Sequence, residues 1–190
     1  MRMKEDHMLN GQLKPGYNIQ VGTENNFVIG YDVFPNPTDT RTFAPHLENV
    51  QNRLKCKFKT VIADAGYGSE ENYDYLEEKE ITGIVKYPSY EKETKRSFKK
   101  KIFNAENWKY DAEQKEYTCP CGNPVPYKKT VTKKNESGYM QTYEVYRCDN
   151  CEGCPFRALC TKSEYGRMVQ RNEHRLEQKA KVKELLATYE

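Results

Sequence analysis

No part of this sequence contains a long apolar run. A membrane-spanning helix needs roughly 20 consecutive apolar residues, and no stretch of the chain comes close to that length. The charged segment Met1–His7 is not followed by the apolar stretch of a secretory signal. We therefore expect a cytoplasmic protein that does not bind membranes, in a compartment where cysteine thiols stay reduced.

Histidine and net charge are also scarce. The 3 histidines, His7, His46 and His174, lie far apart in the sequence, so we interpret each as a surface or core residue rather than a ligand. A net charge of +3, from 31 basic and 28 acidic residues, is too small to indicate nucleic-acid binding by itself. A function of that kind must rest on local clusters of lysine and arginine.

The chain nevertheless has enough apolar material for a core. Hydrophobic residues make up only 36% of the total, but 15 tyrosines and 7 phenylalanines bring large ring areas, which argues against a disordered chain. A length of 190 residues suits one domain, or a core domain with a small appendage.

The first part of the chain predicts a β-hairpin followed by a helix. Residues 17–24 alternate apolar and polar, residues 27–34 form a second strand-like run, and Asn25-Asn26 suits the turn between them. After the prolines at 35 and 37, Thr38 or Asp39 is expected to cap a helix. The inner face of that helix is predicted to carry Phe43, Leu47, Val50 and Leu54.

Two further strands and a helix complete this part, which ends near Tyr87. Residues 60–63 predict a short apolar strand, and residues 81–87 predict another. Between them Ser69 is expected to cap a helix with Tyr73 and Leu76 facing inward. The order strand, strand, helix, strand, helix, strand indicates an α/β fold of the α+β type, with a mixed sheet and helices packed on it.

The stretch Val61–Ser69 carries the clearest chemical signal. Asp64 follows a predicted strand directly, and Gly66 and Gly68 let the backbone turn away so that the carboxylate stays exposed. Mg²⁺ prefers oxygen ligands, often one or two carboxylates with substrate phosphates, and two such ions can activate the attacking oxygen and stabilise the leaving one. One aspartate does not hold two ions, and an aspartate before glycine is equally a turn-capping residue.

The sequence around Asp64 resembles a known family. Ala63-Asp64-Ala65-Gly66-Tyr67, followed by a helix, resembles the second-aspartate motif of bacterial insertion-sequence DDE transposases. Residues 11–18 resemble the segment that opens their hairpin, Asp39 resembles their polar residue at the start of the next helix, and the cysteine-rich third part is similar to an insertion in one branch of these enzymes.

This resemblance implies an RNase H-like core that cuts and joins DNA. Asp64 would be a catalytic residue that binds Mg²⁺ or Mn²⁺, the partner would be DNA at insertion-sequence ends, and the intact enzyme would be a homo-oligomer.

The other two acidic residues of the family do not stand in their usual patterns. The first aspartate should lie on the strand before the hairpin, but Asp6 sits in no strand pattern. The glutamate should lie on a late helix within Tyr-Arg-Glu-Lys, which neither Glu173 nor Glu177 shows. We therefore expect an internal fragment of a transposase that is inactive or nearly so alone. Two other hypotheses remain. Glu173 could substitute for the family's glutamate, or the chain could be an inert product of a decayed element.

Six of the seven cysteines lie between Ile102 and Lys162. Thiolates at short intervals on turns can converge on a tetrahedral Zn²⁺ ion, and two such groups separated by strands resemble a zinc ribbon. We favour structural Zn²⁺, while an iron–sulfur cluster and unliganded thiols stay open, because six cysteines exceed four ligand positions. Cys56 stands alone at a helix end and is interpreted as a packed residue. The candidate metal ligands are Cys119, Cys121, Cys148, Cys151, Cys154 and Cys160.

Residues 88–101 are a basic linker by composition. A solvated flexible loop and a segment that contacts DNA phosphates are both open interpretations. Lysines beside the cysteine cluster are further candidates for DNA contact. The candidate DNA-binding residues are Lys95, Arg96, Lys99, Lys100, Lys101, Lys128 and Lys129.

The predicted organisation has four parts: a partial RNase H-like core over 1–87, the basic linker over 88–101, a small cysteine-rich, β-rich insertion over 102–165, and a C-terminal helix within 166–190. Strands in the insertion are expected near 108–110, 116–118 and 139–146. A hypothesis from a different class is a zinc-ribbon DNA-binding module carried on a non-catalytic scaffold.

Overall fold

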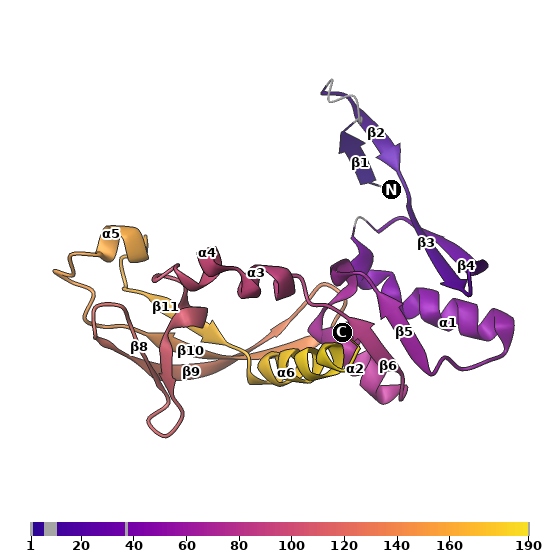
Figure 1. The fold of residues 1–190 in the computed structure, drawn as a ribbon. Helices are drawn as coiled ribbons and strands as arrows, with labels where there is room; N and C mark the ends of the chain where they lie inside the picture. The colour runs from indigo at the N-terminus through magenta and orange to yellow at the C-terminus, as the bar shows by residue number, and fades with distance from the viewer. Residues whose placement is uncertain (1, 6–10, 37, 190) are drawn as a thin grey trace. The chain divides into compact units, whose positions relative to one another are not determined.

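The structure is a computed structural model that describes residues 2–5, 11–36 and 38–189. The chain divides into two compact units, unit 1 with Met1–Pro88 and Gln178–Glu190, and unit 2 with Ser89–Glu177 (Figure 1). Helices and strands occur together in a mixed α/β architecture, which confirms the predicted α+β class. Asp6 and His7, considered above, lie outside the described residues.

Two antiparallel hairpins open unit 1. Their strands are β1 (Arg2–Glu5), β2 (Leu13–Gly16), β3 (Asn18–Glu24) and β4 (Phe27–Phe34). Asn25 and Asn26 connect β3 to β4 with φ angles of 48° and 68°, in the left-handed region that asparagine tolerates. The predicted hairpin and its turn are therefore confirmed.

The helix after the hairpin begins later than predicted. A single turn, η1 (Asp39–Arg41), precedes α1 (Phe43–Leu54), and neither Thr38 nor Thr42 makes a side-chain cap. The prediction that Thr38 or Asp39 caps α1 was wrong, because η1 takes up this segment and the Asp39 carboxylate bonds elsewhere. Leu54 is 43% exposed at the end of the helix, so its predicted inward position was also wrong.

A parallel strand pair forms the second half of unit 1. The elements are β5 (Thr60–Ala63), η2 (Ala65–Tyr67), α2 (Glu70–Glu78) and β6 (Thr82–Val85). The Ser69 hydroxyl accepts a hydrogen bond from the Asn72 amide at 3.2 Å, which confirms the predicted cap. The buried core of this region consists of Phe43, Leu47, Leu76, Ile81 and Val85.

The strands of unit 1 do not form the single mixed sheet that we expected. In the part of the chain that the structure describes, β3–β4 and β5–β6 are separate two-stranded sheets. One face of the β3–β4 hairpin is also uncovered, because its alternating large side chains are more than half exposed. These side chains are Tyr17, Ile19, Val21, Tyr31 and Val33.

Unit 2 is built on a five-stranded antiparallel sheet in the order β11-β10-β9-β8-β7 (Figure 1). Its strands are β7 (Lys109–Asp111), β8 (Glu116–Thr118), β9 (Pro124–Lys134), β10 (Met140–Arg147) and β11 (Met168–Arg171). β9 and β11 were not predicted. β9 has two prolines among its first three residues and holds four lysines, so its sequence does not show the pattern typical of a strand.

Short helices fill the remainder of unit 2. They are α3 (Tyr90–Thr94), α4 (Arg96–Lys99), η3 (Ala105–Asn107) and α5 (Arg157–Cys160). The basic stretch 88–101 therefore contains two short helices rather than a plain loop. The core cluster of the unit contains Trp108, Tyr117, Val125, Tyr146, Cys148, Cys151 and Val169.

The last element is α6 (Glu173–Ala187), which confirms the predicted C-terminal helix. Val182 and Leu186 of this helix are buried, whereas Leu176 is 38% exposed. Gln178 is buried as well and donates to the Asp74 carboxylate at 2.6 Å and to the Glu70 carbonyl at 3.2 Å. Among the described residues, no helix is both long and apolar enough to span a membrane.

Replacing Gly30 by alanine should destabilise unit 1. A Cβ at Gly30 would lie 2.7 Å from Cγ2 of the buried Val50 on α1, and overpacking of this kind costs typically about 1–3 kcal/mol. Gly22, its partner across the hairpin, is the matched control, because a Cβ there would be no closer than 3.4 Å to any neighbour. Urea unfolding should show a clear loss for Gly30→Ala and little change for Gly22→Ala; equal losses would contradict this account.

Candidate functional site

Asp64 lies directly after β5 with its side chain exposed. Its Oδ1 accepts a hydrogen bond from the Ala65 amide, and its carbonyl accepts one from the Tyr67 amide at 3.0 Å, which starts η2. Within the described part of the chain, Oδ2 of Asp64 has no hydrogen-bond partner. The carboxylate thus caps the turn with one oxygen and presents the other to solvent.

Asp39 is held next to the same turn by two amides. Asn18 donates to Asp39 Oδ1 at 2.8 Å, and Gln20 donates to it at 3.3 Å. The second oxygen, Oδ2, faces the backbone that follows Asp64, since a Cβ built on Gly66 would lie 3.4 Å from it. The start of β3, the single turn η1 and the turn after β5 therefore meet at one place in unit 1.

The side chain of Gln20 connects Asp39 to Tyr67. It is only 3% exposed, and while its amide nitrogen donates to Asp39, its Oε1 accepts from the Tyr67 hydroxyl. Asn72 adds a second connection by donating to the carbonyls of Thr40 at 2.9 Å and Tyr67 at 2.8 Å. These bonds fix the backbone after Asp64 against the segment that carries Asp39.

Two negative charges act on Tyr67. Burial raises the pKa of its hydroxyl most, and the charges of Asp39 and, more weakly, Asp64 raise that pKa further. Both carboxylates therefore lie close enough to the Tyr67 hydroxyl to interact with it electrostatically.

Carboxylate oxygens are suitable ligands for Mg²⁺, which proteins often bind through one or two carboxylates together with substrate phosphates. Asp64 and Asp39 supply oxygens of this kind at one end of unit 1. No group of three histidine, cysteine, aspartate or glutamate side chains among the described residues is arranged to hold a metal ion as it stands. The carboxylate of Glu173, considered above as a substitute, forms a two-fold ion pair with the Arg171 guanidinium in unit 2.

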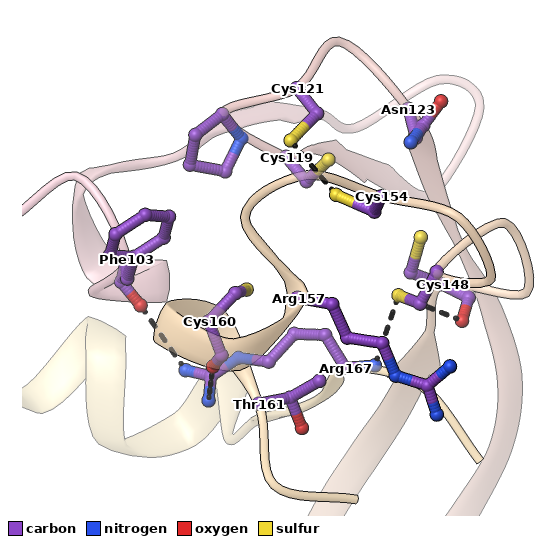
Figure 2. A pocket seen from close by; sticks show the side chains of 12 residues that line it. Phe103, Cys119, Cys121, Asn123, Cys148, Cys154, Arg157, Cys160, Thr161 and Arg167 are labelled. Carbon is purple, nitrogen blue, oxygen red and sulfur yellow. Dashed lines mark hydrogen bonds between the residues drawn. The ribbon is translucent and has the colours of Figure 1, made fainter. Parts of the chain in front are cut away.

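The six clustered cysteines line one small cavity in unit 2. Its volume is about 20 Å³, and Figure 2 shows their side chains around it together with Arg157 and Arg167. The structure thus brings together all six candidate metal ligands. Cys56 lies apart in unit 1 and is exposed, so its interpretation as a packed residue was wrong.

The thiols lie close to one another from different segments. Sγ of Cys121 is 3.2 Å from Sγ of Cys154, and this contact, followed by burial, raises the pKa of Cys121 to about 11. Burial, followed by a contact with Cys151, raises the pKa of Cys148 to about 12. Cys151 Sγ also accepts a hydrogen bond from the backbone amide of Arg167 at 3.4 Å.

Arg167 is a functional candidate that sequence reasoning missed. Its guanidinium donates to the carbonyls of Cys160 at 3.2 Å and Phe103 at 3.3 Å, and it lies 5.7 Å from the ring centroid of Trp108. Its Nε is buried and has no hydrogen-bond partner among the described residues. No signal in the sequence marks it, because it lies seven residues after the last cysteine in an irregular segment.

The candidate DNA-binding residues are all exposed. Lys128 forms an ion pair with Asp149, which neutralises part of its charge. The basic residues from Lys95 to Lys101 project from a segment whose backbone is anchored, because Asn107 donates to the carbonyls of Phe98 at 2.9 Å and Lys101 at 3.1 Å. An ordered backbone thus presents exposed positive charges.

Comparison with known proteins bears on both units. The model of the transposase DDE domain family matches residues 2–182. Searches of curated proteins and of solved structures found no match. Because the match extends over nearly the whole chain, including the hairpins, the Asp64 turn and the cysteine-rich unit, the chain belongs to the transposase DDE domain family, whose domains are RNase H-like.

Proposed function

We propose that this chain carries the second catalytic aspartate of a DNA strand cleavage and transfer site, and that this residue is Asp64. The observation that supports the proposal is the free Oδ2 oxygen of Asp64 at the end of β5, on a turn that the Gln20 and Asn72 hydrogen bonds hold in place. A carboxylate on a fixed turn can bind a divalent ion without reorganising during the reaction.

Asp39 supports the same site without replacing Asp64. One of its oxygens is taken by Asn18 and Gln20, and the other faces the turn after Asp64. Its charge adds to the negative potential at this end of unit 1, which attracts a cation. A bound divalent ion would polarise a phosphate of the DNA and lower the pKa of a bound water, while Asp64 holds the ion in position.

We propose further that the chain by itself does not transfer DNA strands. Chemistry with two ions needs more carboxylates than Asp64 and Asp39 supply, and Glu173 is committed to Arg171. Unit 2 would contribute DNA affinity through the exposed basic segment 95–101, whose charges neutralise phosphates and release counterions. A cytoplasmic location, where the DNA is accessible, belongs to the same proposal.

Divalent-ion binding to the chain should depend on Asp64. Mn²⁺ titrated into the protein and followed by water proton relaxation should bind to wild type, and Asp64→Ala should reduce the affinity by about tenfold or more, equivalent to roughly 1.4 kcal/mol. Asp39→Asn should cause a smaller loss. Glu24→Gln, which removes an exposed carboxylate elsewhere in unit 1, is the control; a loss as large as that of Asp64→Ala would show that binding is nonspecific.

The chain alone should give no strand-transfer product. Incubation with Mg²⁺ and a DNA substrate carrying insertion-sequence ends should leave the DNA uncut, because the acidic set is incomplete. Transfer by the wild-type chain that disappears in Asp64→Ala would overturn the inactivity proposal and support the site. Strand transfer that persists in Asp64→Ala would show that other residues carry the activity.

The basic segment should account for part of the salt dependence of DNA binding. The slope of log K against log salt changes by roughly 0.9 per phosphate contact, so the Lys99→Ala, Lys100→Ala, Lys101→Ala triple variant should lower its magnitude by up to about 2.7. Lys128→Ala is the matched control, because Asp149 already pairs with Lys128. Filter binding at several salt concentrations measures both slopes. Equal slopes for wild type and the triple variant would show that this segment does not contact the DNA phosphates.

A further inference from the structure

We propose that the cavity in unit 2 binds a single Zn²⁺ ion through four cysteine thiolates, and that Cys119 and Cys154 are two of the four. The proposal goes beyond the proposed function, since it concerns a different unit and does not depend on Asp64. Its basis is the convergence of thiols from three separate segments of chain on one small space.

The sulfur atoms come from both sides of the cavity. Cys119 and Cys121 lie on the turn between β8 and β9, whereas Cys154 lies on the loop after β10. Figure 2 shows the sulfurs of these three residues gathered at one end of the cavity, with the Cys121–Cys154 contact at 3.2 Å. Thiols 33 residues apart in sequence do not approach in this way through local turn geometry alone.

The size of the cavity favours one ion over a cluster. A space of about 20 Å³ is close to what one water molecule requires, about 10–15 Å³ on the same kind of measure. It therefore suits a single ion and is too small for the several iron and sulfide atoms of an iron–sulfur cluster. Zn²⁺ with four thiolate ligands is the common structural site of that size.

The surroundings suit a thiolate site. Four thiolates around Zn²⁺ leave a net negative charge, and the Arg167 guanidinium, anchored on the Cys160 and Phe103 carbonyls, supplies a positive charge at the cavity wall. The Arg167 backbone amide donates to Cys151 Sγ at 3.4 Å, and hydrogen bonds of this kind stabilise sulfur ligands. Gly166 has φ +87°, and a Cβ there would lie 2.3 Å from the Cys148 carbonyl oxygen and 3.4 Å from this sulfur, so glycine lets the two segments approach.

The protein also has a structural reason to bind an ion here. The loop from β10 to β11 contains only the four-residue helix α5, so regular hydrogen bonding does little to hold it. Cys148 and Cys151 belong to the small core of unit 2, and small cores often need a metal or another cross-link. Since no three thiols already stand as a complete ligand set, binding requires rotation of side chains and loss of their protons.

Cys119 and Cys154 are distinguished because they come from the two main loops that line the cavity. Cys119 packs against the core cluster of unit 2, and Sγ of Cys154 lies 3.2 Å from Sγ of Cys121, which shares a turn with Cys119. Six thiols compete for four positions, so any one of the remaining four can be lost and replaced by another.

The test uses the full chain with Zn²⁺ and with Co²⁺ as a spectroscopic substitute. Wild type purified under reducing conditions should hold one Zn²⁺ per chain, and Co²⁺ should give the absorption bands of tetrahedral thiolate coordination. Loss of a second-shell group costs roughly 10–100-fold in affinity, so Cys119→Ser and Cys154→Ser should each cost at least about 100-fold. Cys121→Ser and Cys148→Ser should cost less, and Cys56→Ser should have no effect.

A second readout does not rely on variants that must fold. Trp108 is the only tryptophan of the chain and belongs to the core cluster that contains Cys148 and Cys151. Stripping metal from wild type with a chelator should change its fluorescence, and adding Zn²⁺ alone should restore it. Absence of zinc from the purified protein together with unchanged fluorescence would overturn the proposal, as would iron and sulfide in place of zinc. Equal losses of Zn²⁺ affinity in Cys56→Ser and Cys119→Ser would show that the bound metal is an adventitious ion only.

Discussion

The side chain of Gln20 is buried, and both ends of its amide are occupied, the nitrogen by Asp39 and Asn18 and the oxygen by Tyr67. A buried amide left without partners costs roughly 1–3 kcal/mol, so this network favours one arrangement of β3, η1 and the Asp64 turn over others. The acidic end of unit 1 depends on it, because a short strand of four residues does not fix the direction of the chain that follows it. The proposed site in this unit therefore depends on a neutral residue of the hairpin.

In unit 2 a small sheet carries long loops, and different contacts stabilise the sheet and the loops. Rings at its centre pack edge-to-face, with Tyr146 and Tyr117 centroids 5.1 Å apart, and Arg171 stacks on Tyr110 at 4.0 Å. These contacts stabilise the strands but do not reach the loop that carries Cys154. That loop is held by the Phe103–Phe156 ring contact, by the thiols that pack against the core, and by the hydrogen bonds of Arg167. Apolar and polar contacts therefore act together at that end of the unit.

The sequence predicts elements well where local chemistry is decisive. Asn25-Asn26 and Ser69 were recognised because a left-handed turn and a helix cap depend on the residue itself. The onset of α1 was missed, since it depends on the bonds of Asp39 to the hairpin. The exposure of Leu54 was missed because Leu54 is the last residue of the helix. β9 was missed because lysines on an exposed ribbon give no apolar alternation. Motif and spacing predicted Asp64 and the six cysteines as candidates, and the structure gathers the six cysteines at one cavity. Gln20 and Arg167 were missed, because they act through three-dimensional neighbours that no local pattern encodes.

The uncovered face of the β3–β4 hairpin has a consequence for the fate of the chain in a cell. Five large apolar side chains there stand more than half exposed, and a net charge of +3 gives copies of the chain little mutual repulsion. Apolar area of this kind is unfavourable in water, so a molecule that buried this face would raise the folded fraction of the chain by mass action.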